Sequence, residues 1–278
     1  MTNSTPPTPP IEAHSPTDTS DDYSSIDYRP AAVIRWGLPQ FAIGLGLFVG
    51  IIVAVNLLSL FLPTWAQSPL LFAAIIIGYG ALFLTALRAA RSRGSGSLAE
   101  DFGLRFRLVD LAIGLGVGIA AKIVGFIVAI PLLRLTGGAP ASNVPVQSEL
   151  LWIILNTVVA TALVAPLVEE LFFRGLLLRA IRNGILRGRA SRPRTAQPSA
   201  ARARGALLTS VLISSVAFMA LHLYQARDLA TLVVLGSATL ILGLANAALA
   251  TRTGRLGPGI VAHMVFNGVA LVGFFATR

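Results

Sequence analysis

The sequence contains no cysteine among its 278 residues, which excludes disulfide bonds and thiolate metal ligands. Lysine is almost as scarce, because Lys122 is the only one and arginine supplies the rest of the basic side chains. Charged residues make up only 12% of the chain, whereas hydrophobic residues make up 55% and the mean hydropathy is +0.76. Soluble globular proteins carry about 25% charged residues. The composition therefore predicts a polytopic membrane protein.

The net charge of +10 could suggest nucleic-acid binding. However, no recognition motif accompanies the charge, and the arginines lie mainly between long apolar runs. Arginines in such connectors determine the orientation of membrane helices. We therefore expect membrane lipids as partners, and no nucleic acid.

Seven apolar runs follow a polar N-terminal segment. Residues 1–30 are rich in Ser, Thr, Pro and Asp and should be disordered, because they cannot bury enough apolar surface to become ordered. Each run approaches or exceeds the ~20 residues that a helix needs to cross the hydrocarbon core. We predict an all-α fold, a polytopic transmembrane helical bundle of about seven spans, with N-terminal transmembrane helices in 31–149 and a second group in 150–278. The runs lie at about 37–62, 69–88, 110–133, 150–181, 206–223, 229–250 and 258–276.

The arginine-rich connectors are alternate ones, at about 88–107, 187–204 and 252–255. This alternation predicts a cytoplasmic amino terminus and a carboxy terminus outside, and we expect the plasma membrane of a bacterium. The connector at 187–204 could also gather anionic lipid or an acidic substrate, although we interpret it first as a topology signal and a flexible insert.

Two adjacent acids, Glu169 and Glu170, interrupt the fourth apolar run. An ionisable side chain at bilayer depth costs roughly 2.5–3.5 kcal/mol even on lenient insertion scales. Arg174 follows Glu170 by four residues, hence lies on the same helix face and can pair with it. Glu169 is rotated by about 100° and can point elsewhere. A structural ion pair with a spare acid would also fit this pattern.

Other polar side chains occur at one-turn spacing in later runs. His222 follows Phe218 in the fifth run, and Asn267 follows His263 in the seventh. A single histidine of this kind can equally be a core residue that is hydrogen-bonded between helices. Because each such group carries its own cost in the membrane, we expect all of them to share one site with Glu169.

Glu-Glu-x-x-x-Arg at 169–174, Phe-x-x-x-His at 218–222 and His-x-x-x-Asn at 263–267 occur in this order on late apolar runs. Together they resemble the CPBP intramembrane peptidases, which include type II CAAX prenyl endopeptidases and bacteriocin-processing and self-immunity proteins. The resemblance covers about residues 150–275. It implies that 150–278 is the catalytic core of an intramembrane endopeptidase acting on membrane-associated or lipidated peptides or proteins.

The resemblance also implies roles for the acidic motif. Glu169 would be the general base, and Glu170 with Arg174 would brace the site. The chemistry is consistent with this, because peptide hydrolysis needs a water activated by a base and donors aimed at a developing oxyanion. Two neighbouring carboxylates in a low-dielectric site resist ionising together, and Arg174 can keep Glu170 ionised.

For the later motifs, the resemblance implies that His222 helps to hold the water, with Phe218 as structural support. His263 and Asn267 would face the scissile carbonyl and its developing oxyanion. One geometric condition follows. His263 would lie about 9 Å into its helix at 1.5 Å per residue, whereas His222 ends the fifth run. Both reach Glu169 only if the fifth helix is tilted, starts deeper than residue 206, or is displaced relative to the other helices.

Two alternatives remain. Glu169, His222 and His263 would form an adequate three-ligand zinc set, but the sequence has no His-Glu-x-x-His motif, and we favour a mechanism without metal or other cofactor. The other alternative is a transporter or a non-catalytic membrane scaffold, encouraged by Lys122 in the third run. Lys122 could instead pair with a buried acid or lie along a groove. No internal inverted repeat is visible, which counts against a transporter.

Overall fold

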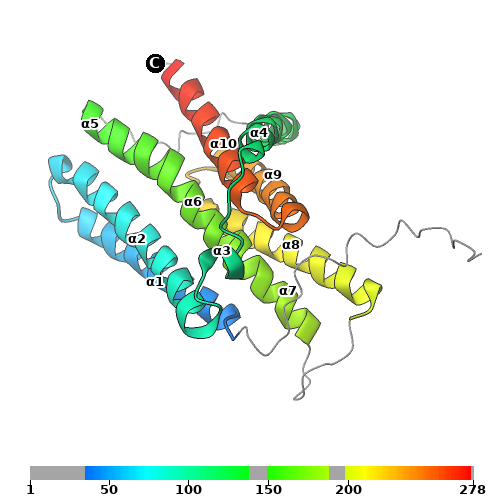
Figure 1. Ribbon diagram of the computed structural model, residues 1–278. Helices are drawn as coiled ribbons and strands as arrows, with labels where there is room; N and C mark the ends of the chain where they lie inside the picture. Colours follow the sequence, from blue (N-terminus) through cyan, green and yellow to red (C-terminus); the bar gives the residue numbers. More distant parts are fainter. Residues whose placement is uncertain (1–34, 138–148, 188–197, 277–278) are drawn as a thin grey trace, which may run out of the picture.

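The computed structural model describes residues 35–137, 149–187 and 198–276 (Figure 1). The segment 1–30, predicted to be disordered, and most of the connector at 187–204 lie outside these ranges. Across the described ranges all regular elements are helices and no strand is present. The predicted all-α fold is therefore confirmed.

The helices, in chain order, are α1 (Leu38–Ser59), α2 (Thr64–Arg93), α3 (Leu98–Asp101), α4 (Val109–Thr136), α5 (Leu150–Trp152), η1 (Ile153–Val164), α6 (Ala165–Glu170), η2 (Leu171–Leu177), α7 (Leu178–Arg187), α8 (Ala200–His222), η3 (Leu223–Gln225), α9 (Leu229–Thr253) and α10 (Gly257–Ala276). Here η1 and η2 are π-helical and η3 is a short 3-10 helix. Elements α5 to α7 form one continuous helix across the molecule (Figure 1).

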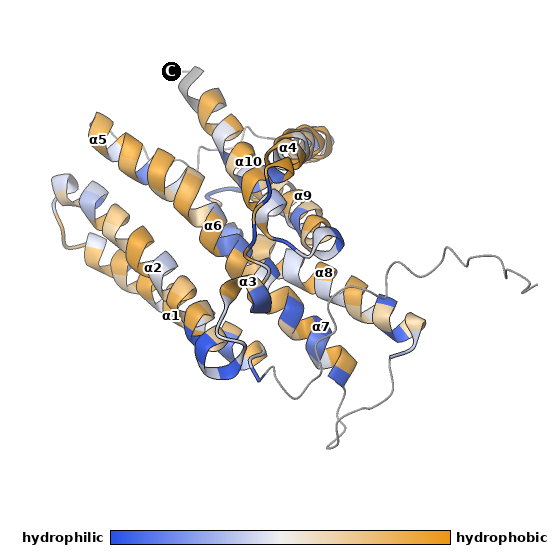
Figure 2. Cartoon of the chain, in the orientation of Figure 1, coloured by the Kyte–Doolittle hydropathy of each residue, from blue (hydrophilic) through white to orange (hydrophobic). Residues whose placement is uncertain are grey.

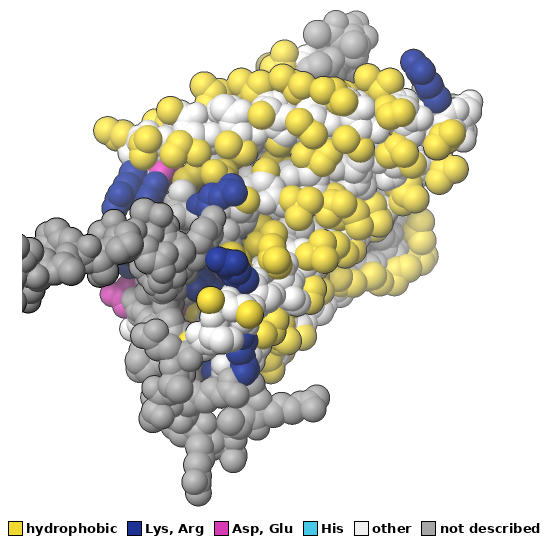
Figure 3. All heavy atoms as spheres, turned by 90° about the vertical axis from the view of Figure 1, so that its right-hand side faces the viewer, with side chains coloured by type: hydrophobic (Ala, Val, Ile, Leu, Met, Phe, Trp, Pro, Cys, Tyr) yellow, Lys and Arg dark blue, Asp and Glu magenta, His cyan; other side chains and the backbone are white. Residues whose placement is uncertain are grey.

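Six helices of the described chain are long and apolar enough to cross a membrane, with Leu150–Arg187 counted as one, and Gly257–Val272 forms a shorter apolar helix. Apolar residues cover most of the helices along their length (Figure 2). Hydrophobic side chains also cover the middle of the face in Figure 3, where most of the visible basic side chains gather at one end. The protein is an integral membrane protein.

The continuous helix Leu150–Arg187 has 38 residues and extends beyond the predicted run 150–181. At 1.5 Å per residue it is about 57 Å long, nearly twice the ~30 Å hydrocarbon core. Pro166, which has no backbone N–H to donate, lies near its middle, just before the two glutamates. The α-helical segment that carries Glu169 and Glu170 is flanked by η1 and η2, and π-helical geometry is frequent at functional sites.

Two groups of helices pack against this central helix. The pair α1 and α2 lies along one side (Figure 1), where the ring of Phe41 stacks on Phe172 at 4.7 Å between centroids. On the other side, α4 packs closely against α10, because a side chain at Gly114 or Gly118 would collide with Val261 or the backbone of Ala262. Small residues permit such close approach of membrane helices.

An ion pair fixes the polar ends of α4 and α10. Arg255, just before α10, donates a 2.6 Å hydrogen bond from Nη2 to Asp110 Oδ1 near the start of α4. The same carboxylate accepts a 2.8 Å hydrogen bond from the backbone N–H of Arg107. These contacts set the height of α10, and thereby of His263, relative to the other helices.

Candidate active site

Glu170 and Arg174 form the buried ion pair that their spacing predicted. Arg174 Nη1 lies 3.2 Å from Glu170 Oε1, and the two side chains are 0% and 1% exposed. Arg174 Nη2 also donates a 3.1 Å hydrogen bond to the carbonyl of Gly243 in α9. Gly243 has no side chain to block this approach, since a Cβ there would lie 3.3 Å from Nη2. The pair therefore joins the central helix to α9.

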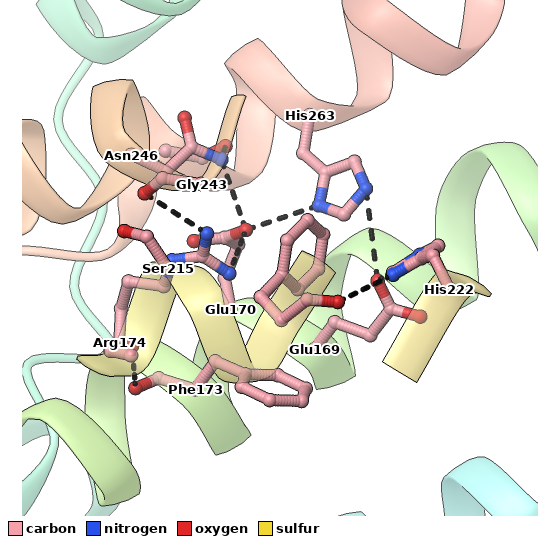
Figure 4. A network of polar contacts seen from close by, with 12 residues as sticks. Glu169, Glu170, Phe173, Arg174, Ser215, His222, Gly243, Asn246 and His263 are labelled. Atoms are coloured by element: carbon pink, nitrogen blue, oxygen red, sulfur yellow. Dashed lines mark hydrogen bonds and ion pairs between the residues drawn. The ribbon is translucent and has the colours of Figure 1, made fainter. Parts of the chain in front are cut away.

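Two further side chains converge on the same oxygen of Glu170 (Figure 4). Asn246 of α9 donates a 2.9 Å hydrogen bond from Nδ2 to Oε1, and His263 Nδ1 of α10 lies 3.1 Å from it. Asn246 Nδ2 also donates to the carbonyl of Gly259 at 3.1 Å. A buried carboxylate needs partners of this kind to remain ionised. Partners from three helices, the central helix, α9 and α10, therefore hold the Glu170 carboxylate in place.

Glu169 points in a different direction from Glu170, toward Tyr79, His222 and the other nitrogen of His263 (Figure 4). The hydroxyl of Tyr79 in α2 donates a 2.6 Å hydrogen bond to Oε1. The other oxygen, Oε2, lies 3.7 Å from His263 Nε2 and 3.9 Å from His222 Nε2. Both histidines therefore face one carboxylate oxygen. The geometric condition posed by the sequence is met.

α8 packs against the central helix near Phe173, whose carbonyl accepts a 3.0 Å hydrogen bond from the Ser214 hydroxyl, and this packing places His222 beside Glu169. The helix begins at Ala200, six residues before the predicted start at 206, and His222 is its last residue. Its arginine-rich first turns precede the apolar part, so the apolar run does not begin where the helix begins. His222 stays 15% exposed at the side chain, whereas His263 is 2% exposed. The site is therefore accessible beside His222.

The hydrogen-bond partners determine which imidazole nitrogen carries the proton. His222 Nδ1 lies 2.8 Å from the carbonyl of Phe218, which can only accept, so Nδ1 carries a hydrogen. His263 Nδ1 faces Glu170, which the Arg174 charge keeps as an acceptor, so the same holds there. In the neutral tautomers both Nε2 atoms are then acceptors that face Glu169 Oε2.

Phe218 is fully buried at the centre of this arrangement. Its ring contacts the imidazoles of His222 and His263, with centroids 4.5 and 5.5 Å apart, and the guanidinium carbon of Arg174 lies 4.3 Å from its centroid. Its ring also meets Phe173 edge-on at 5.4 Å. Phe218 thus packs against the Arg174 guanidinium and both imidazoles and supports the orientation of the two rings.

Asn267 lies one turn beyond His263 on α10, and its amide donates a 3.1 Å hydrogen bond to the carbonyl of Thr161 in η1. This contact ties α10 to η1 of the central helix. One of the two amide hydrogens is used in this bond, and the amide group has a second one.

Two residues of the site were not predicted from the sequence. Tyr79 lies in the second apolar run and Asn246 in the sixth, where neither belongs to a motif. A polar residue within an apolar membrane helix was the only available signal. That signal does not identify which of several such residues faces the site.

The described chain is all-helical, and its spans enclose two buried carboxylates, an arginine and two histidines. It is a polytopic membrane protein with a polar centre enclosed by apolar helices. Residues 150–269 match the family model described as type II CAAX prenyl endopeptidase Rce1-like. This segment is therefore similar to a family of CAAX-type intramembrane proteases, and the predicted resemblance is confirmed. No curated protein and no solved structure matches the chain.

The family match contains all the motif residues but not the whole site. Tyr79 on α2, which donates to Glu169, lies outside residues 150–269. The zinc alternative was based on Glu169, His222 and His263, and no group of three or more His, Asp or Glu side chains able to hold a metal ion occurs in the part of the chain that the structure describes.

Proposed function

We propose that the protein is an intramembrane endopeptidase that hydrolyses peptide bonds of membrane-associated substrates with a water activated by Glu169. The observation that carries the proposal is the position of Glu169 Oε2, 3.7 and 3.9 Å from the Nε2 atoms of His263 and His222. The family of residues 150–269 supports the same reaction class.

These distances suit a water-mediated contact better than a direct one. Nitrogen–oxygen separations beyond about 3.5 Å are too long for a direct hydrogen bond. Three acceptors that face one another also need a donor between them. In our proposal the nucleophilic water donates one hydrogen to Glu169 Oε2 and the other to His222 Nε2. Tyr79 fixes the orientation of the carboxylate through its other oxygen.

The reaction follows from this placement. Glu169 takes a proton from the water as the water oxygen bonds to the scissile carbonyl carbon, and the carbonyl oxygen becomes an oxyanion. We assign the stabilisation of that oxyanion to the amide of Asn267, and to His263 when protonation of Nε2 makes that nitrogen a donor. The proton held by Glu169 then passes to the amide nitrogen, the carbon–nitrogen bond breaks, and an amine and a carboxylic acid leave.

Glu170 has a different role in this proposal, although it adjoins the base in sequence. Its charge is compensated by Arg174 and its oxygen Oε1 is occupied by three partners. It holds His263 through Nδ1, so that Nε2 faces Glu169. Glu170 and Arg174 are therefore positioning residues, and Glu169 is the catalytic base.

The substrates we propose are peptides or proteins that carry a lipid group at the cleavage region, in keeping with the CAAX family. The orientation we propose is the one predicted from the arginines, with the amino terminus in the cytoplasm. Figure 3 supports it, since basic side chains gather at one end of the apolar surface.

The test is peptidase activity of the purified protein in detergent on a panel of prenylated and unprenylated peptides, with and without a chelator. We expect cleavage that survives chelation and disappears in Glu169→Gln. Cleavage that chelation abolishes and zinc restores would instead support the zinc-dependent alternative. Ion or proton flux in liposomes, without cleavage of any peptide, would overturn the proposal in favour of a transporter.

A further inference from the structure

Lys122 is the only lysine of the chain and lies well inside the membrane-spanning helix α4, thirteen residues beyond its first residue Val109. At 1.5 Å per residue this is about 20 Å from the helix start. Among the described residues its ammonium contacts two aromatic rings and no carboxylate, with Nζ 4.0 Å from the centroid of Phe266 and 5.8 Å from that of Phe126.

A cation–π contact of this kind does not satisfy a lysine within a membrane. The ammonium has three hydrogen-bond donors and a full charge, whereas an aromatic face offers only a weak, diffuse attraction. By contrast, the buried cation of the central helix, Arg174, is paired with Glu170. Ionisable residues in a membrane span that lack a partner mark a site for a ligand more often than a structural element.

The position of Phe266 places the ammonium near the proposed active site. Phe266 lies between His263 and Asn267 on α10, and residues three apart on a helix have Cβ atoms about 5–6 Å apart. The path from His263 to the Lys122 ammonium also includes the length of the Phe266 side chain and the 4.0 Å from its ring to Nζ, so the ammonium lies within roughly 15 Å of the His263 side chain by the same helix geometry. Lys122 is half-buried, so its ammonium is partly accessible to a ligand.

The distance between Lys122 and the active site is consistent with one anion of the substrate, its C-terminal carboxylate. A C-a-a-X motif ends the substrate chain, so its free α-carboxylate lies within a few residues of any bond cut inside the motif. Three extended residues span about 10 Å. A substrate whose scissile carbonyl lies at Glu169 would thus extend its terminal carboxylate into the range within which Lys122 lies.

We propose that Lys122 binds the C-terminal carboxylate of the substrate and so makes the enzyme selective for bonds close to a chain end. The inference rests on the proposed function, because it assumes a peptide in the site. It gives α4, which lies outside the family match, a part in substrate recognition. Lys122 in this proposal determines specificity and takes no part in the chemistry.

The experiment uses the full-length protein in detergent and one farnesylated peptide ending in a C-a-a-X motif, prepared as the free acid and as the C-terminal amide. We expect wild type to prefer the acid in kcat/KM by on the order of 10- to 100-fold, the effect of one charge-assisted hydrogen bond. Lys122→Met, which keeps the length of the side chain, should bring the acid-to-amide ratio close to one, and Lys122→Arg should retain most of the preference.

Arg134→Met is the matched control, because it removes an exposed cation in the last turn of the same helix, α4. It should keep the wild-type ratio. An unchanged ratio in Lys122→Met would overturn the inference. An equal loss on both peptides would also overturn it, since it would indicate a contact with lipid or a role in folding.

Binding separates this inference from the proposed function. The fluorescently labelled acid and amide are titrated into Glu169→Gln and into the double variant Glu169→Gln/Lys122→Met. Binding that prefers the acid and loses this preference with Lys122 supports the carboxylate site, even if wild type cleaves neither peptide and the proposed reaction fails. Equal binding of the two peptides to Glu169→Gln would overturn the site.

Discussion

Tyr79 donates a 2.6 Å hydrogen bond from its hydroxyl to Glu169 Oε1, which connects α2 to the central helix. The donor comes from a part of the chain that the family match does not cover. The ring of Tyr79 packs against Phe48 of α1, with centroids 5.5 Å apart. The pair α1 and α2 therefore does more than anchor the protein, because it orients the proposed base.

Tyr79→Phe keeps this ring and removes the hydroxyl. We expect kcat to fall by on the order of 10- to 100-fold, because a small displacement of a reacting group has an effect of that size, while KM changes little. Steady-state kinetics on one peptide measure both quantities. Thr85→Val is the control, since the Thr85 hydroxyl bonds only within α2, to the carbonyl of Ala81. A Tyr79→Phe variant with wild-type kcat would contradict the orienting role.

Glu169→Gln preserves the size of the side chain but removes the basic carboxylate. We expect hydrolysis to fall by roughly 10²–10⁴-fold, the usual contribution of a general base, with normal expression and membrane insertion. Glu170→Gln should retain more activity but unfold at a lower temperature, because it weakens the pair with Arg174. Equal effects of the two substitutions on activity would argue against separate roles for the two acids.

Arg174→Ala leaves Glu170 as a buried charge without its counter-ion. Removing one partner of a buried pair destabilises a protein by about 3–5 kcal/mol, so we expect a lower yield and a lower thermal unfolding midpoint in detergent. Arg252→Ala, at an exposed position in the last turn of α9, should behave as wild type. Normal accumulation of Arg174→Ala with full activity would show that the pair does not brace the site.

Asn246→Ala removes the donor that Glu170 and the carbonyl of Gly259 share. Losing one hydrogen bond to a charged group costs about 1.5–3 kcal/mol, so the unfolding midpoint should fall, by less than in Arg174→Ala. Asn56→Ala serves as the control, because that amide is exposed and bonds within α1 to the carbonyl of Ile52. Similar midpoints for both variants would remove Asn246 from the bracing network.

Asn267→Ala distinguishes two roles for one amide. As an oxyanion donor, Asn267 should contribute on the order of 10²–10³-fold to kcat, whereas as a link to Thr161 it should contribute only to stability. We expect the loss in kcat, with a similar but smaller loss for His263→Ala. The kcat and the unfolding midpoint of Asn267→Ala, measured on the same preparation, decide between the roles. A lower midpoint with normal kcat would favour the structural role.

The sequence by itself determined the class of protein, the approximate positions of the spans and the partners within one helix. Apolar runs specify membrane helices because the bilayer leaves the backbone few other ways to form its hydrogen bonds. The pairing of Glu170 with Arg174 followed in the same way, since residues four apart on a helix share a face. These relationships are local, so the order of residues is enough to predict them.

Tertiary structure decided how the helices meet. It brings Tyr79 to Glu169 and Asn246 to Glu170, across 90 and 76 positions of sequence. It also places both histidines at one oxygen of Glu169, which depends on how α8 and α10 pack against the central helix. Hydropathy records only that a residue lies in the membrane. Which way it faces depends on close packing at particular residues, such as Gly118 against α10 and Gly243 against Arg174, and this packing is a property of two helices together.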